Sequence, residues 1–175
     1  ELVLERVLEA SGLQSGREYV TQTHFSDSEG RGQRPDVIVH LPENKDIVID
    51  SKVSLVAYER FVSSTDDVAR ASALGEHVGS LRRHIDGLSK KSYESLEDLR
   101  TLDFVLLFVP VEAAFIEAVR ADDSLYAHAL AKNIAIVSPS TLLATLRTVA
   151  HIWSIEKRHV NTMEIAAAGA RLHDN

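Results

Sequence analysis

Among the charged residues of the stretch RPDVIVHLPENKDIVIDSK, which runs from Arg34 to Lys52, two aspartates and one lysine are spaced so that they could do chemistry together. Asp36 precedes a short apolar run, Asp50 ends the next run, and Lys52 follows two residues later. Carboxylate oxygens suit a hard divalent cation such as Mg²⁺ or Mn²⁺, and a cation neutralises paired carboxylates that otherwise repel each other. Such a cation polarises a phosphate and lowers the pKa of a bound water, while a neighbouring lysine orients that water or offsets charge in the transition state. These residue types could therefore hydrolyse a phosphodiester, provided that the three side chains converge.

The two apolar runs, 37–41 (VIVHL) and 46–50 (DIVID), are rich in β-branched residues and flank a Pro-Glu-Asn-Lys turn, which predicts a hairpin. Successive side chains of a strand point to opposite faces. One face of the hairpin is therefore wholly apolar and is expected in the core. The other face carries Asp36, His40 and Asp50, with Lys52 continuing its alternation.

The register of this hairpin decides whether the two aspartates meet. They face each other only where the numbers of facing residues sum to an even value, which needs a three-residue loop or a bulge. A four-residue loop closed by Leu41 and Asp46 would separate them. Where they meet, the backbone carbonyl of Ser51 could supply another oxygen ligand. The alternative interpretation is a half-exposed hairpin with solvated charges and an ordinary Asp–Lys pair.

The rest of the chain predicts the elements that must position this hairpin. Apolar periodicity and turn residues separate helical from extended segments. The expected helices are 1–10, 65–88, 111–120, 123–132, 138–157 and 161–172, and the expected strands are 19–25, 37–41, 46–50, 104–109 and 134–137. The first strands follow one another by short connections and the later ones by helical crossovers. This order predicts an α/β fold with a mixed central sheet flanked by helices on both faces.

Length and composition limit the classes of protein that fit. A chain of 175 residues suits one domain with a full core. The net charge of −7 argues against coating nucleic acid through bulk positive charge, although a local basic patch can still grip DNA. The absence of cysteine excludes thiolate metal sites, and the absence of a glycine-rich phosphate loop leaves a nucleotide cofactor unsupported.

The location of the protein follows from similar considerations. No apolar run approaches the ~20 residues that span a bilayer, so we expect no membrane contact by this domain and a cytoplasmic location. The chain starts at Glu1 inside a helical pattern, and its one methionine is Met163. We therefore expect a single domain over residues 1–175 that was excised from a longer protein.

Several long stretches of the chain resemble a known family. Pro35-Asp36, followed after a β-turn by Asp50-Ser51-Lys52 and preceded by a glutamate-bearing helix, resembles the PD-(D/E)xK nuclease superfamily. More narrowly, the chain resembles the RmuC family of bacterial DNA recombination proteins over essentially its whole length. The stretches that carry this resemblance are ELVLERVLEASGL, RPDVIVHLP, VIDSKVSLVAYERF, LRTLDFVLLFVPVEAAF and SPSTLLATLRTVAHIWS.

The resemblance implies a restriction-endonuclease-like core and a metal-dependent nuclease that acts on DNA in recombination or genome maintenance. It implies that Asp36 and Asp50 are ligands of Mg²⁺ or Mn²⁺ and that Lys52 is the catalytic lysine. The superfamily often adds a glutamate from the first helix, for which Glu1 is preferred and Glu5 is the alternative. Full-length relatives resemble membrane-tethered proteins with a coiled-coil segment before this domain.

Other residues are weaker candidates for contact with DNA. Arg34 flanks the hairpin and could contact a phosphate, and Lys91 with Tyr93 resembles a family feature. Tyr58 could line the site, although a core or rim position is the other interpretation. His40 could support the aspartates from behind or be a half-exposed strand histidine.

A second function class also fits the sequence. The fold of a nuclease can serve as a DNA-binding or protein-interaction scaffold without catalysis, and the acidic net charge is compatible with a protein partner.

Overall fold

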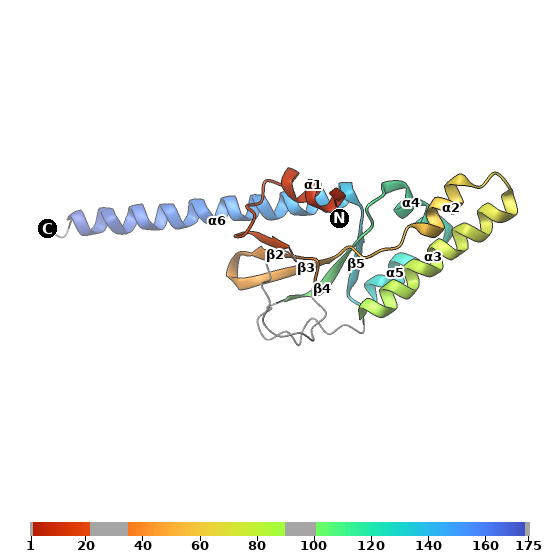
Figure 1. Cartoon of the computed structure of the whole chain (residues 1–175). Helices are drawn as coiled ribbons and strands as arrows, with labels where there is room; N and C mark the ends of the chain where they lie inside the picture. Colours follow the sequence, from red (N-terminus) through yellow and green to blue (C-terminus); the bar gives the residue numbers. More distant parts are fainter. Residues whose placement is uncertain (1, 22–34, 90–100, 174–175) are drawn as a thin grey trace, which may run out of the picture.

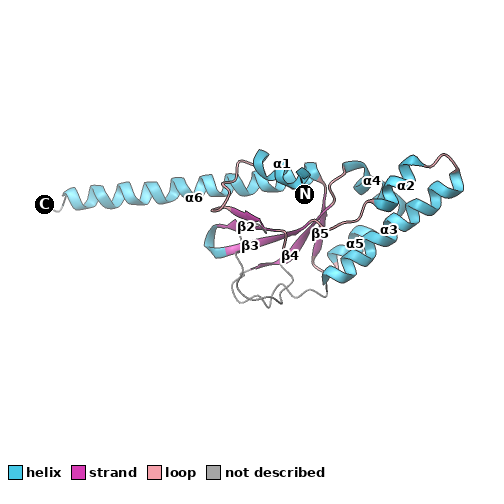
Figure 2. Cartoon of the chain, in the orientation of Figure 1, coloured by secondary structure: helices cyan, strands magenta, loops and turns pink. Residues whose placement is uncertain are grey.

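The computed structural model describes residues 2–21, 35–89 and 101–173. The helices are α1 (Leu2–Ala10), the short 3-10 helix η2 (Pro42–Asn44), α2 (Val56–Ser63), α3 (Asp67–Ser89), α4 (Glu112–Ala121), α5 (Leu125–Leu130) and α6 (Pro139–His173). The strands are β1 (Tyr19–Thr21), β2 (Val37–Leu41), β3 (Lys45–Asp50), β4 (Thr101–Phe108) and β5 (Ile134–Val137). Figure 2 shows the sheet with α1 and α6 above it and α2 to α5 to its right.

The five strands form one mixed sheet in the order β1-β2-β3-β4-β5. The pairs β1–β2 and β2–β3 are antiparallel, whereas β3–β4 and β4–β5 are parallel. The mixed sheet and the order of its elements confirm what the sequence predicted. Because β2 runs antiparallel to β3, β4 and β5, its first residue lies at the same edge of the sheet as the carboxyl ends of those three strands. In Figure 1, α6 begins and α1 begins at this same end of the domain.

Each face of the sheet is covered by its own helices. Alternate residues of β3 divide between the two faces, as strand geometry requires. Ile47 and Ile49 belong to the first core, which the apolar sides of α1 and α6 complete. Val48 belongs to the second core, with α3, α4 and α5. The second face of the hairpin, for which half-exposed charges were one of two interpretations, is therefore mostly buried, because the crossover helices after β3 cover it.

Helix α6 extends far beyond the domain. Its first half packs on the sheet through Leu142, Leu146 and Val149, whereas every residue from 154 to 173 is exposed. Figure 1 shows this second half projecting away from the sheet. The prediction of two helices in this region was wrong, since the backbone continues as one helix through the residues between them.

Two further differences concern single elements. Helix α2 has no counterpart among the predicted elements. Only Ala57 of this helix is buried. The strand predicted over 19–25 is described up to Thr21, and its remaining residues lie outside the described ranges. Across the described ranges, no helix combines the length and apolar character that a bilayer-spanning segment needs.

Candidate functional site at the carboxyl end of β3

The turn between β2 and β3 sets the register on which the site depends. Strand β3 starts at Lys45, which pairs with Leu41, so the turn has three residues rather than four. Glu43 and Asn44 adopt positive φ values of 65° and 56°, which closes the turn tightly. Val37 then pairs with Ile49. Continuing this register by one step places Asp36 opposite Asp50, as convergence of the two aspartates requires.

Asp36 is tied to the segment that leaves β3. Its Oδ2 atom accepts hydrogen bonds from the backbone N–H of Ser51 at 2.8 Å and from the Ser51 hydroxyl at 3.2 Å. Its Oδ1 atom lies 3.4 Å from the Lys52 ammonium. The Asp36 side chain is 12% exposed, whereas that of Lys52 is 53% exposed. The lysine therefore reaches from the buried carboxylate towards the solvent.

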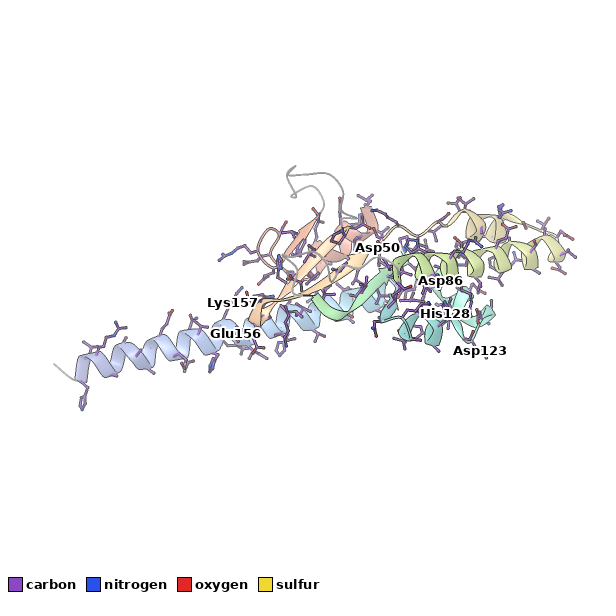
Figure 3. The ribbon with its side chains drawn as sticks, turned by 90° about the horizontal axis from the view of Figure 1, so that it is seen from below. Asp50, Asp86, Asp123, His128, Glu156 and Lys157 are labelled. Atoms are coloured by element: carbon purple, nitrogen blue, oxygen red, sulfur yellow. The ribbon has the colours of Figure 1, made fainter. Side chains whose placement is uncertain are left out.

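Asp50 is the most deeply buried acid of the site, with a side chain that is 1% exposed. Its Oδ1 atom accepts the backbone N–H of Lys52 at 3.3 Å and lies 3.1 Å from Nε2 of His84. Figure 3 shows Asp50 at the end of its strand, beside α3. Asp36, Asp50 and Lys52 are thus brought to one edge of the sheet, and the structure adds a histidine from the crossover helix.

His84 was not predicted from the sequence. It lies on the side of α3 that faces the sheet, because His77, Leu81 and Leu88 share its face at helical spacing and all three are buried. This periodicity was the available signal, but it indicates only that a side chain faces inward and not which group it meets.

Helix α3 is held in place by two polar clusters on α5 and the loop before it. Arg82 contacts the Asp122 carboxylate at 2.6 Å. Asp86 accepts a hydrogen bond from His128 at 2.8 Å and lies 3.5 Å from Lys132. Figure 3 shows the labelled Asp86 and His128 close to each other. The hydrogen bond from His128 holds the pKa of Asp86 below its ordinary value. These contacts fix the position of α3 and therefore the approach of His84 to β3.

A third acid at this edge of the sheet has a structural role. Glu112, the first residue of α4, accepts hydrogen bonds from the hydroxyls of Ser138 and Ser140, each at 2.6 Å, and from the Ser140 backbone N–H at 3.2 Å. The Ser138 bond is the main cause that lowers the pKa of Glu112. Glu112 therefore satisfies donors at the start of α6, where a negative charge is favourable.

The donor atoms at the site fit a hard divalent cation. Two carboxylates, from Asp36 and Asp50, lie on either side of Ser51, whose carbonyl accepts the Val53 N–H at 2.9 Å and retains a second lone pair. Over the described residues, however, no group of three or more histidine, aspartate, glutamate or cysteine side chains is arranged to hold a metal ion. Among the described residues, the oxygen donors at this edge of the sheet include the carboxylates of Asp36 and Asp50 and the carbonyl of Ser51.

The helix glutamate stays a prediction. Glu1 lies outside the described residues. Glu5 is exposed on α1, and this helix packs through Leu4, Val7 and Leu8 against the sheet face opposite to that of the Asp50 side chain.

The remaining candidates are placed as follows. Arg34 and Lys91 lie outside the described residues, so their proposed DNA contacts stay predictions. Tyr58 packs between Phe61 and His77, with ring centroids 6.2 and 5.4 Å away, and borders the second core. This placement matches the core interpretation of Tyr58, and its contact with DNA stays a prediction.

His40 belongs to another part of the hairpin. It pairs across the strands with Asp46, with Nδ1 and Oδ1 separated by 2.6 Å. This pair lies four residue pairs along the hairpin from the position at which Asp36 would face Asp50. His40 is therefore the half-exposed strand histidine of the second interpretation, and its backbone carbonyl accepts the indole N–H of Trp153 at 2.9 Å.

Comparison with known proteins identifies the family. The chain matches the family model described as "RmuC family" over residues 1–175. It is 52% identical over 174 residues to the DNA recombination protein RmuC homolog of Pseudomonas aeruginosa, covering 99% of this chain and 38% of that protein. It is 50% identical to the DNA recombination protein RmuC of Escherichia coli, covering 99% of this chain and 37% of that protein. The Vibrio cholerae homolog is 49% identical, with 99% and 34% covered.

The chain spans less than two fifths of the length of these curated relatives. No solved structure matches it. The family match over all residues, together with identities near one half across 99% of the chain, shows that this chain belongs to the RmuC family.

Proposed function

We propose that this chain is a metal-dependent DNA nuclease domain of the PD-(D/E)xK superfamily, with a restriction-endonuclease-like core formed by residues 1–175. The single observation that carries the proposal is the register of the β2–β3 hairpin. Val37 pairs with Ile49, the next step of this register would bring Asp36 opposite Asp50, and the Asp36 carboxylate lies 3.4 Å from the ammonium of Lys52.

A role in DNA recombination is supported by the relatives. Those that match over 99% of this chain are named DNA recombination proteins. The chain covers less than two fifths of each relative, and we propose that it shares their role in DNA recombination. DNA is then the substrate of the domain, and Arg34 and Lys91 are the proposed phosphate contacts.

Asp36 and Asp50, with the carbonyl of Ser51, are the proposed ligands of Mg²⁺ or Mn²⁺, and Glu1 or Glu5 is the proposed further ligand. Oxygen donors of this kind match the preference of both cations. When bound, the cation polarises the phosphate and lowers the pKa of the attacking water. Before binding, the Lys52 ammonium and the donors on Ser51 offset the negative charge of Asp36.

Lys52 acts from the exposed side of the site. Its ammonium is anchored near Asp36 but its side chain remains half exposed, so a phosphate can approach it from the solvent. The positive charge offsets the charge that develops on the phosphate oxygens during attack, and its N–H groups orient the water.

The scaffold interpretation remains a second candidate because of one observation. Over the described residues, no group of three or more acids, histidines or cysteines is arranged to hold a metal ion. A domain that binds DNA or protein through this fold would need no third ligand.

Cleavage assays test the proposal. Linear, branched and single-stranded DNA are incubated with Mn²⁺ and the wild type, Asp50→Ala or Lys52→Ala. Removal of either group is expected to lower the cleavage rate at least ~100-fold, since loss of one group that stabilises the transition state typically has this effect. Asp46→Ala is the matched control, because Asp46 lies on the same strand and face but pairs with His40. Equal rates in all variants would refute the nuclease function.

Calorimetry with Mn²⁺ separates the two candidates. The nuclease proposal expects binding by the wild type and its loss in Asp50→Ala. Absence of Mn²⁺ binding by the wild type, with DNA binding retained, would favour the scaffold.

A further inference from the structure

We infer that His84 is a positioning residue that orients the Asp50 carboxylate for the divalent cation, an inference that rests on the proposed function. His84 comes from α3, and its Nε2 atom lies 3.1 Å from Oδ1 of Asp50. Nothing in the hairpin motif itself supplies this contact, because the histidine lies 34 residues further along the chain.

The direction of the hydrogen bond follows from the chemistry of the two groups. An ionised carboxylate has no hydrogen to donate, so Nε2 of His84 carries the hydrogen and donates it to Asp50. The same Oδ1 atom accepts the backbone N–H of Lys52 at 3.3 Å. Two donors from separate elements therefore converge on one carboxylate oxygen. Because rotation of the Asp50 carboxylate would break both hydrogen bonds, the two donors together fix its orientation.

His84 is itself held firmly enough to do this. Leu81 and Ile85, its neighbours on α3, are 1% and 0% exposed and pack in the second core. Arg82 and Asp86 tie the same turns of the helix to Asp122 and His128. The imidazole therefore projects from a backbone that is fixed on both sides.

Stability alone does not account for an acid at this position. A carboxylate buried from water is costly even when it is paired, and an apolar residue of similar volume is often the more stable choice. Ligating side chains, by contrast, are commonly oriented by a hydrogen bond from a second residue. Loss of that residue typically lowers the affinity for the metal 10- to 100-fold, on the order seen at other metal sites. The pairing of His84 with Asp50 has this form.

The test uses Mn²⁺ alone, measured by calorimetry without DNA, on the wild type, Asp50→Ala and four further variants. His84→Ala removes the donor and is expected to weaken Mn²⁺ binding about 10- to 100-fold. His84→Gln places an amide N–H near the position of Nε2 and is expected to bind Mn²⁺ within about threefold of the wild type. His84→Asn has an amide that is one carbon shorter, cannot reach Asp50, and is expected to bind as weakly as His84→Ala.

His40→Ala is the matched control. His40 also pairs with an aspartate of the same domain, and its side chain is 35% exposed compared with 23% for His84. It contacts Asp46 and not Asp50, so Mn²⁺ binding should not change. Thermal unfolding of each variant shows whether it folds. Where His84→Ala does not fold, the contrast between His84→Gln and His84→Asn decides the question.

The outcomes separate this inference from the function on which it rests. If the wild type binds Mn²⁺ and Asp50→Ala does not, but His84→Ala binds as the wild type does, the positioning role is overturned and the nuclease proposal stands. Equal weakness of His84→Gln and His84→Asn, or equal weakness of His40→Ala, would also overturn it. Absence of Mn²⁺ binding by the wild type would refute the metal-dependent function and this inference with it.

Discussion

Replacing Asp50 with asparagine is expected to stabilise the metal-free protein while removing its response to metal. The Asp50 side chain is 1% exposed. An ionised carboxylate at such a position costs several kcal/mol, roughly, in lost hydration, and its partners offset this only in part. Asparagine has the same shape, carries no charge and keeps an acceptor oxygen for both His84 and the Lys52 N–H. The change therefore removes the cost and keeps the contacts.

The size of the effect can be estimated from these terms. The two hydrogen bonds lose their charge-assisted part, about 1 kcal/mol each, when the acceptor becomes neutral. Set against a penalty of several kcal/mol, this leaves a net gain of about 1–2 kcal/mol in the free energy of unfolding. For a domain of this size, the gain corresponds to a rise of roughly 2–8 °C in the unfolding temperature.

The response to metal should change in the opposite sense. At a Mn²⁺ concentration of about 100 times its dissociation constant, binding stabilises the wild type by about 2.7 kcal/mol. Asp50→Asn, which has lost a charged ligand, is expected to show little shift. Thermal unfolding followed by far-UV circular dichroism, with a chelator and then with excess Mn²⁺, measures both effects on the same samples.

Asp46→Asn serves as the control for this experiment. Asp46 lies on the same strand and face, and its side chain is 12% exposed beside His40. Its replacement should change the metal-free stability by less than about 1 kcal/mol and leave the Mn²⁺ shift intact. A metal-free Asp50→Asn that unfolds below the wild type, or an equal Mn²⁺ shift in both proteins, would refute the reasoning.

Three other perturbations test the fold that supports the site. Trp153→Phe removes the hydrogen bond to the His40 carbonyl and is expected to cost about 1–2 kcal/mol in urea unfolding, because α6 loses its polar contact with the hairpin; an unchanged midpoint would contradict this. The pKa of Glu112 is held below its ordinary value of 4.5, so its contribution to stability is complete above pH 4.5 and is lost as the pH falls through the lower folded value. Glu112→Gln should therefore show a shallower acid loss of stability in urea titrations at several pH values, and parallel curves would refute the cap. Removal of residues 158–173, all exposed, should change the free energy of unfolding by no more than about 0.5 kcal/mol while reducing the helical signal.

The strands of the hairpin could be predicted because their residues carry a strong local signal. The β-branched runs 37–41 and 46–50 alternate faces whatever surrounds them, and the structure has strands at both. The length of the turn could not be predicted in the same way. It depends on Glu43 at φ 65°, a conformation that few residues with a Cβ adopt and that glutamate does not signal. The sequence therefore left two registers open, and the structure adopts the one in which the numbers of facing residues sum to an even value.

Burial of the polar face was missed for a different reason. Alternation along 46–50 shows which residues share a face, but what covers that face is decided by the crossover from β3 to β4. That crossover places α3 over Val48 and Asp50. The same limit explains α6. The buried apolar stripe of α6 ends near Val149. Beyond it, good helix formers such as Ala166 and Ala167 keep the backbone helical without any packing partner among the described residues.

The contact between His84 and Asp50 could not be predicted from the sequence for a related reason. Helical spacing from Leu81 and Leu88 indicates that His84 faces the sheet, but its partner depends on how far α3 slides along β3. A shift of one turn, about 5.4 Å, would leave Asp50 beside an apolar residue instead. Burial of Leu81, Ile85 and Leu88 opposes that shift, and the Arg82–Asp122 and Asp86–His128 contacts on the other side of α3 add to it. Polar pairs on the far side of α3 thus help to determine which donor the buried aspartate meets. Loss of both pairs is expected to weaken Mn²⁺ binding, because His84 would be held less firmly beside Asp50.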